Sequence, residues 1–229
     1  MTTPNFSAGR DVAIVGFAQT KHVRSEDTLS EVELIQPVIA EAMNQVGLDH
    51  HGFDFYCSGS SDYLAGQAFS FVMTLDAIGA WPPVAESHVE MDGAWALYEA
   101  YLKIRSGHAD TALVYGYGKS SPGDLPRVLS RMCEPYYTAP LWPTSVELAA
   151  LQARACIEAG ITSEAEMAEV AARDRRSARD NPNAQLAWDI GAAELLAGEY
   201  LANPLRRDDC APITDGGAAI VLASPERAA

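Results

Sequence analysis

The feature that most constrains the fold is the alternation of short apolar runs with helical periodicity in the first half of the chain. The runs at residues 11–17, 53–57, 84–90 and 111–116 are rich in β-branched and apolar residues, as buried strands are. Segments 34–46 and 93–106 instead repeat apolar side chains at helical spacing and stop at Gly47 and Gly107. This alternation predicts an α/β layer around a mostly parallel sheet.

Local signals refine the helices. Thr28-Leu-Ser-Glu31 fits a capping box ahead of segment 34–46, and Pro37 inside that segment predicts a kink or a later start. Residues 65–79 are apolar enough to form one buried helix. These patterns assign residues 1–118 to the α/β region.

The pattern changes in the second half of the chain. Residues 119–206 are helical and interrupted by prolines, with helices expected at 146–158 and 163–179 and a capping box at Ser163 and Glu166. We expect this stretch to be a helical insertion without sheet. Strand character returns at 215–223, so residues 207–229 should contain the final strand of the α/β region.

Composition excludes several classes of function. The chain has 16 Lys and Arg against 31 Asp and Glu, a net charge of -15, which repels nucleic acid and anionic lipid headgroups. It shows neither a secretory signal nor an 18-residue apolar run, so the cytoplasm is the expected location and no membrane partner is expected. The four cysteines form no C-x-x-C pair and the histidines show no ligand spacing, so no metal is expected.

Three segments resemble the thiolase superfamily, in particular its sterol-carrier-protein thiolase branch. Val12-Ala-Ile-Val-Gly16 is similar to the family's opening strand, and Ile104-Arg-Ser-Gly-His-Ala-Asp-Thr-Ala-Leu-Val114 to the end of its catalytic helix and the next strand. The most specific is Asp209-Cys-Ala-Pro-Ile-Thr-Asp-Gly-Gly-Ala-Ala-Ile-Val221, which resembles the strand that closes the family's first half.

The resemblance implies the first αβα half of a thiolase-like fold, a mixed five-stranded sheet with residues 119–206 in the place of the family's loop domain. Thiolases pack two such halves together, so one apolar face should await a second half, either in a longer polypeptide or on another chain. It also implies a homodimer.

The family's nucleophilic cysteine is missing at the position that the resemblance implies. The family signature Cys-Ala-Ser-Gly aligns with Glu90-Met-Asp-Gly93, so Glu90 replaces the cysteine at the helix start. A carboxylate that attacked a thioester would form a reactive mixed anhydride, so thiolysis and condensation should be absent. Glu90 and Asp92 are candidate catalytic groups, as a base or as a hydrogen-bond acceptor for the substrate. Alternatively, Asp92 caps the helix, and Glu90 is a carboxylate near the helix start that the helix dipole stabilises.

Segments 89–97, 115–123 and 135–143 resemble the actinobacterial thiolase-like aldolases of steroid side-chain degradation. That resemblance implies retro-aldol cleavage of a 17-hydroxy steroid propionyl-CoA to a ketosteroid and propionyl-CoA, with no cofactor because coenzyme A belongs to the substrate. It also implies a MaoC-like hydratase partner with an OB-fold and zinc-ribbon domain, in a heterotetramer. The alternatives are a non-catalytic acyl-CoA-binding or scaffold subunit and an acyltransferase, although the latter needs the missing cysteine.

Aromatic and basic residues supply candidate binding groups. Tyr136, Tyr137 and Trp142 are candidates to line a flat steroid site, and packing within the insertion is their plainer interpretation. Lys119, Arg127 and Arg131 are candidates to contact CoA phosphates, and ordinary solvated charges are their plainer interpretation.

Overall fold

The computed structural model describes residues 9–66, 68–79, 81–82 and 84–229, which fall into two compact units. The first unit contains the described part of residues 1–120 and residues 215–229, and the second contains residues 121–214. Residues 207–214 therefore group with the second unit, ahead of the last strand.

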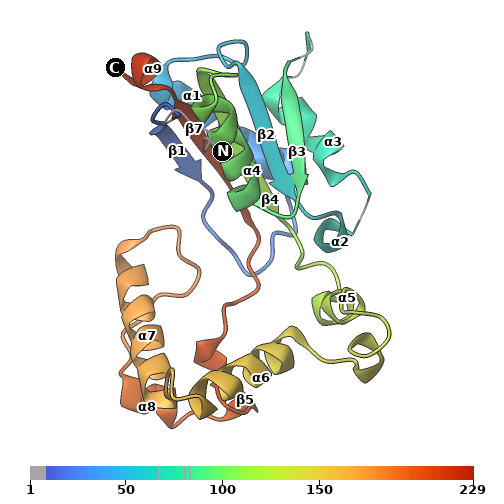
Figure 1. Ribbon diagram of the computed structural model, residues 1–229, viewed down its shortest axis with the longest axis vertical. Coiled ribbons are helices and arrows are strands. Elements are labelled where there is room, and N and C mark those ends of the chain that lie inside the picture. The colour runs from blue at the N-terminus through green and yellow to red at the C-terminus, as the bar shows by residue number, and fades with distance from the viewer. Residues whose placement is uncertain (1–8, 67, 80, 83) are drawn as a thin grey trace, which may run out of the picture. The chain divides into compact units, whose positions relative to one another are not determined.

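The first unit is built on a five-stranded mixed sheet in the order β1-β7-β4-β2-β3 (Figure 1). Its strands are β1 (Ala13–Gln19), β2 (Phe55–Ser60), β3 (Glu86–Glu90), β4 (Thr111–Gly118) and β7 (Gly216–Ala223). Strands β2, β3 and β4 are parallel, and β7 runs antiparallel to both β1 and β4. The predicted α/β class and mixed five-stranded sheet are confirmed.

Two long helices pack against this sheet, and the alternation of side chains along the strands explains why. Helix α1 (Glu31–Val46) packs on the side of Tyr56, Leu113 and Val221. Helix α4 (Gly93–Arg105) packs with Cys57, Val114 and Leu222, which point the opposite way. Both faces of the sheet therefore contribute a buried apolar layer, as the near-continuous apolar runs in the sequence predict.

The predicted capping box at Thr28 and Glu31 is wrong by two residues. Ser30 is the N-cap of α1; its hydroxyl accepts from the Glu33 N–H, while the Glu33 carboxylate accepts from the Ser30 N–H. Thr28 lies in the preceding turn, where its N–H donates to the Glu26 carboxylate at 2.9 Å. Pro37 stays inside the helix, which ends at Gly47 as expected.

The single helix predicted for residues 65–79 is also wrong, and residue 67 of that span lies outside the described residues. The chain instead forms α2 (Asp62–Ala65), α3 (Ser70–Thr74) and the 3-10 turn η1 (Leu75–Ile78). Gly66 and Phe69 both have positive φ, of 74° and 56°, which interrupts a right-handed helix. Apolar composition alone did not reveal these breaks.

The second unit is mainly helical. It contains α5 (Leu125–Arg131), η2 (Ala139–Leu141), α6 (Ser145–Glu158), α7 (Glu164–Ser177), η3 (Ala178–Asp180), α8 (Ala192–Leu196) and η4 (Arg207–Asp209). The expectation of no sheet is wrong in detail, because β5 (Tyr200–Ala202) and β6 (Leu205–Arg206) form an antiparallel pair. The Glu164 carboxylate binds Tyr200 and Arg206, which fastens this pair to the start of α7. The chain ends in α9 (Pro225–Ala228) of the first unit.

None of the helices formed by the described residues has both the length and the apolar run that a membrane span requires.

Candidate functional site

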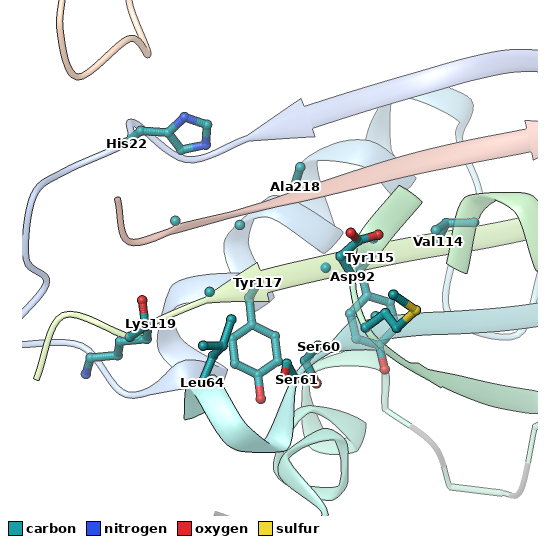
Figure 2. A pocket seen from close by; sticks show the side chains of 18 of the residues that line it. His22, Ser60, Ser61, Leu64, Asp92, Val114, Tyr115, Tyr117, Lys119 and Ala218 are labelled. Atoms are coloured by element: carbon teal, nitrogen blue, oxygen red, sulfur yellow. The ribbon is translucent and has the colours of Figure 1, made fainter. Parts of the chain in front are cut away.

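One edge of the sheet in the first unit gathers segments that are far apart in the sequence. Strands β1 to β4 all run toward this edge, and β7 begins there, because β7 is antiparallel to its neighbours. The carboxyl ends of strands in open α/β sheets commonly form ligand sites. A cavity of about 420 Å³ opens at this edge, and Figure 2 shows side chains from several of these segments around it.

Glycines form much of the cavity floor. Gly59 on β2 is paired with Gly116 on β4, and the first residue of α4, Gly93, lies directly over them. A Cβ atom on Gly59 would lie 2.3 Å from the Asp92 carbonyl oxygen, and one on Gly116 would lie 3.1 Å from the Gly93 Cα. Only a glycine at position 59 of β2 therefore lets the start of α4 approach the sheet this closely.

Asp92 stands at the cavity and caps α4. Its carboxylate oxygen accepts from the N–H groups of Ala94 and Trp95, at 2.9 and 3.1 Å. These are the donors that a helix N-terminus would otherwise offer to an anionic group. The side chain of Asp92 therefore occupies two of the N–H donors in the first turn of α4, the helix that is catalytic in the thiolases that the sequence resembles.

Glu90, which takes the place of the cysteine in the alignment, is not among the residues that line the cavity. Its carboxylate accepts from the Asp62 N–H at 2.8 Å and lies 3.6 Å from His88 Nε2. The structure thus brings Asp92 to the cavity and directs the Glu90 carboxylate toward α2.

Hydroxyl groups dominate the side of the cavity formed by β2, β4 and α2. Ser60, Ser61 and Tyr117 line it, with the Tyr117 hydroxyl donating to the Ser70 carbonyl oxygen at 3.0 Å (Figure 2). Burial raises the pKa of Tyr117, and it raises the pKa of the neighbouring Tyr115 to about 12. Both phenols are therefore neutral at physiological pH, and the proton of Tyr117 is already donated to Ser70.

None of the four cysteines lines this cavity. Cys57 is fully buried beneath α4, and burial raises the pKa of its thiol to about 12. The other three, Cys133, Cys156 and Cys210, belong to the second unit. Among the described residues, no group of three or more His, Cys, Asp or Glu side chains is arranged to hold a metal ion.

The mouth of the cavity carries His22 and Lys119 (Figure 2). The Lys119 ammonium donates to the Leu29 carbonyl oxygen. Asp215, from the family-like segment, is fully buried and accepts from the Glu26 N–H at 2.9 Å, while its backbone pairs with Val23. This aspartate therefore fastens the segment after β1 to the start of β7 and so places His22.

The three aromatic residues predicted to line a steroid site belong to the second unit. Tyr136 and Tyr137 are exposed, and their N–H groups donate to the Glu134 carboxylate, at 2.8 and 2.7 Å. Trp142 is also exposed and lies 6.0 Å from the Arg131 guanidinium. Within their own unit these side chains form no buried aromatic cluster.

Sequence reasoning missed the glycine floor and the serine and tyrosine wall. A signal for the floor was present, since Gly59 and Gly116 interrupt apolar strand runs, and glycine within a strand often marks a close approach of another backbone. The wall gave no such signal, because Ser60 and Ser61 fit an ordinary βα turn equally well.

Comparisons with known proteins place these features in a wider context. No family model matches the chain. An acetyl-CoA acetyltransferase of Methanocaldococcus jannaschii is 29% identical over 96% of this chain, and human sterol carrier protein 2 is 24% identical over 94%. These matches cover 57% and 42% of the relatives, so the chain spans about half the length of the curated relatives it matches.

Solved structures share the fold. An Ltp2-ChsH2(DUF35) aldolase superimposes with a TM-score of 0.77 at 22% identity, over 95% of this chain and 56% of that one. A monomeric SCP2-thiolase-like protein from Mycobacterium smegmatis gives a TM-score of 0.65 at 22% identity, over 95% and 46%. The chain is therefore thiolase-like and resembles the sterol-carrier-protein thiolase branch, as its sequence segments predicted.

Proposed function

We propose that this chain is part of a retro-aldolase, a carbon–carbon lyase that cleaves a β-hydroxyacyl-CoA. The observation that carries the proposal is the start of α4, where the cavity lies beside the capping residue Asp92 and no cysteine lines it. Covalent acyl transfer needs an activated thiolate, whereas retro-aldol cleavage needs a base and stabilisation of an enolate but no covalent nucleophile. The aldolase among the structural neighbours agrees with this choice.

In the proposed reaction a base removes the proton from the β-hydroxyl group of the substrate. The Cα–Cβ bond breaks, the hydroxyl-bearing carbon leaves as a ketone, and the remaining electron pair forms the enolate of the shortened acyl-CoA. Protonation of the enolate then releases the acyl-CoA, with no cofactor consumed. The substrate we propose is a 17-hydroxy steroid propionyl-CoA, which would give a 17-ketosteroid and propionyl-CoA.

The lining of the cavity supports the proposal of an acyl substrate. Apolar side chains of Leu64, Met91, Val114 and Ile220 line it together with the glycine floor. Neutral phenol and serine hydroxyl groups stand on one side, and a few polar groups in an otherwise apolar hollow are typical of small-molecule sites. We propose Asp92 as a group that meets the substrate here and Glu90 as one that supports the wall; Tyr136, Tyr137 and Trp142 remain proposed steroid contacts.

A MaoC-like hydratase subunit with an OB-fold and zinc-ribbon domain is the proposed partner, in a cytoplasmic heterotetramer built on a homodimer. The support is the name of the structural neighbour, an aldolase complex that contains a DUF35 component. The reaction offers a second reason, since a hydratase makes the β-hydroxyacyl-CoA that a retro-aldolase consumes.

The test uses the full-length polypeptide with and without the hydratase subunit. Each sample is incubated with a β-hydroxy steroid acyl-CoA, and ketone and short acyl-CoA are measured together by mass spectrometry. We expect equal amounts of both products. Absence of ketone with every pairing would exclude the lyase.

The second candidate function is a non-catalytic acyl-CoA-binding or scaffold subunit. The observation that favours it is the Asp92 cap, which occupies two helix donors that an anionic intermediate could otherwise use. Binding of the steroid acyl-CoA by calorimetry, without ketone formation, would identify this alternative.

A further inference from the structure

The His88 side chain on β3 has neighbours on three sides. Its Nδ1 lies 2.9 Å from the hydroxyl oxygen of Ser58 on β2, and its ring stacks on Phe71 of α3 with centroids 4.5 Å apart. Its Nε2 is buried, has no hydrogen-bond partner among the described residues, and lies 3.6 Å from the Glu90 carboxylate. A buried ring nitrogen without a partner is costly unless another protonation state supplies one.

The same Glu90 carboxylate begins a chain of contacts that shapes the segment from α2 to α3. It accepts from the Asp62 N–H at 2.8 Å, and the Asp62 carboxylate accepts from the N–H groups of Phe69 and Ser70 at 2.7 and 2.8 Å. These contacts join two short helices, α2 of four residues and α3 of five, which positive φ angles at Gly66 and Phe69 separate.

This segment forms a wall of the cavity. Leu64 of α2 lines the cavity, and Ser70 contacts two other lining residues: its hydroxyl lies 2.9 Å from that of Ser60, and its carbonyl oxygen accepts from Tyr117. The position of α2 and the start of α3 therefore decides where Leu64 and the Tyr117 hydroxyl stand.

We propose that His88, Glu90 and Asp62 form a proton-dependent clasp, in which protonated His88 holds the Glu90 carboxylate and thereby orders the α2–α3 wall of the cavity. Neutral His88 exchanges between two tautomers: with Nε2–H it donates to Glu90 without a charge and accepts from Ser58, and with Nδ1–H donated to Ser58 its Nε2 lone pair faces the negative carboxylate, which is repulsive. Once Nε2 gains a proton it donates to Glu90, and the contact becomes a charge-assisted hydrogen bond. Histidine is the side chain whose charge changes between about pH 5 and pH 8.

The charged groups nearest to the His88 ring are carboxylates. Glu90 lies 3.6 Å from His88 Nε2, and hydrogen bonds from Ser70 and Phe69, with a smaller contribution from a charged His88, lower the pKa of Asp62. Glu86 shares the face of β3 with His88 and is exposed. The neighbours that contact the ring from β2 and α3, Ser58 and Phe71, are neutral. The clasp makes Glu90 a positioning residue, whatever reaction the cavity performs.

Amide hydrogen exchange of the full chain between about pH 8 and pH 5.5 tests the clasp without any substrate, so its result does not depend on the proposed reaction. The variant is Glu90→Gln, whose amide oxygen still accepts from the Asp62 N–H while the negative charge is removed. Comparing variant and wild type at each pH cancels the intrinsic pH dependence of exchange. The amides of Asp62, Phe69 and Ser70 are followed, and the His88 ring signals are recorded by NMR in the same samples.

In the wild type we expect these amides to exchange about three- to tenfold more slowly than in Glu90→Gln once His88 is protonated, and the difference should vanish where the ring is neutral. The matched control is Glu86→Gln, which removes a carboxylate two residues before His88 instead of two after it and should behave as the wild type. Equal protection in Glu90→Gln and wild type at every pH, an equal effect of Glu86→Gln, or a His88 ring that stays neutral throughout would each overturn the proposal.

Discussion

At the scale of single residues, the glycines beneath α4 set how closely the helix approaches the sheet. Gly59 and Gly118 both line the cavity, but a Cβ on Gly59 would meet the Asp92 backbone at 2.3 Å, whereas one on Gly118 would meet no atom within 4 Å. Both glycines lie near strand ends, but only position 59 has no room for a side chain.

We predict that Gly59→Ala lowers the free energy of unfolding by about 1–3 kcal/mol, because the methyl group must displace the first turn of α4. Urea denaturation followed by circular dichroism measures the change. Gly118→Ala is the matched control and should stay within about 0.5 kcal/mol of the wild type. Equal effects of the two substitutions would show that the close approach is not what requires glycine.

The buried Cys57 thiol gives a second prediction at this scale. Because burial raises its pKa to about 12, almost no thiolate exists at pH 8, and the thiolate is the reactive form. We expect iodoacetamide to leave Cys57 unmodified in the folded protein and to alkylate it after denaturation. Peptide mapping by mass spectrometry reads out both states.

None of the four cysteines should carry an acyl group after incubation with acyl-CoA, and intact-mass measurement tests this. Glu90 aligns with the nucleophilic cysteine of thiolases, and no cysteine lines the cavity. An acylated Cys133, the loop cysteine whose Sγ contacts the Leu129 carbonyl oxygen at 3.6 Å, would contradict this prediction.

At the scale of elements, the start of α4 depends on its capping residue. Asp92 accepts two backbone N–H groups, so Asp92→Ala should lower the free energy of unfolding by about 1 kcal/mol. Asp92→Asn keeps an accepting oxygen and should lose less than half as much. Thermal denaturation of the two variants compares them.

The same pair of variants separates a capping role from a chemical one. If Asp92→Asn keeps its melting temperature yet loses ketone formation, the carboxylate acts on the substrate in addition to capping. If Asp92→Asn and Asp92→Ala lower the melting temperature equally, an amide oxygen does not replace the carboxylate as the helix cap.

At the scale of the whole molecule, acidity is the dominant electrostatic property. The net charge of -15 disfavours the compact state at neutral pH, and acidification relieves that repulsion. Exposed capping carboxylates act in the opposite direction. Glu147, for example, accepts from the backbone N–H and hydroxyl of Thr144, and these hydrogen bonds lower its pKa.

The sign of the capping contribution follows from linkage. A carboxyl group whose pKa is lower in the folded state stabilises that state above its unfolded pKa, and the contribution is lost as the pH falls through the folded pKa. We predict that wild type is more stable than Glu147→Gln at pH 6 and that the difference shrinks between about pH 5 and pH 3. Urea denaturation at each pH measures it, and Glu169→Gln, on an exposed part of α7, should show no such trend.

Much of the fold could be predicted because its causes are local. Apolar periodicity located β1, β4, α1, α4 and β7, and the stop at Gly47 follows from the left-handed conformation that glycine adopts there. Local sequence signals misplaced the N-cap of α1, because Thr28 and Ser30 are both possible capping residues within three positions. They also missed the break between α2 and α3, where the Phe69 N–H donates to the Asp62 carboxylate.

The sequence by itself determined the order of the main strands and helices of the α/β region, the acidic charge and the absence of a cysteine at the start of α4. Only the tertiary structure decided what the replacing residues touch. Glu90 and Asp92 are two residues apart, yet Asp92 turns to its own helix and Glu90 to α2, because β3 ends at Glu90 and the chain bends at Met91 before Asp92 caps α4. The cavity likewise depends on β7, which begins about a hundred residues after β4 ends and completes the edge only through sheet pairing.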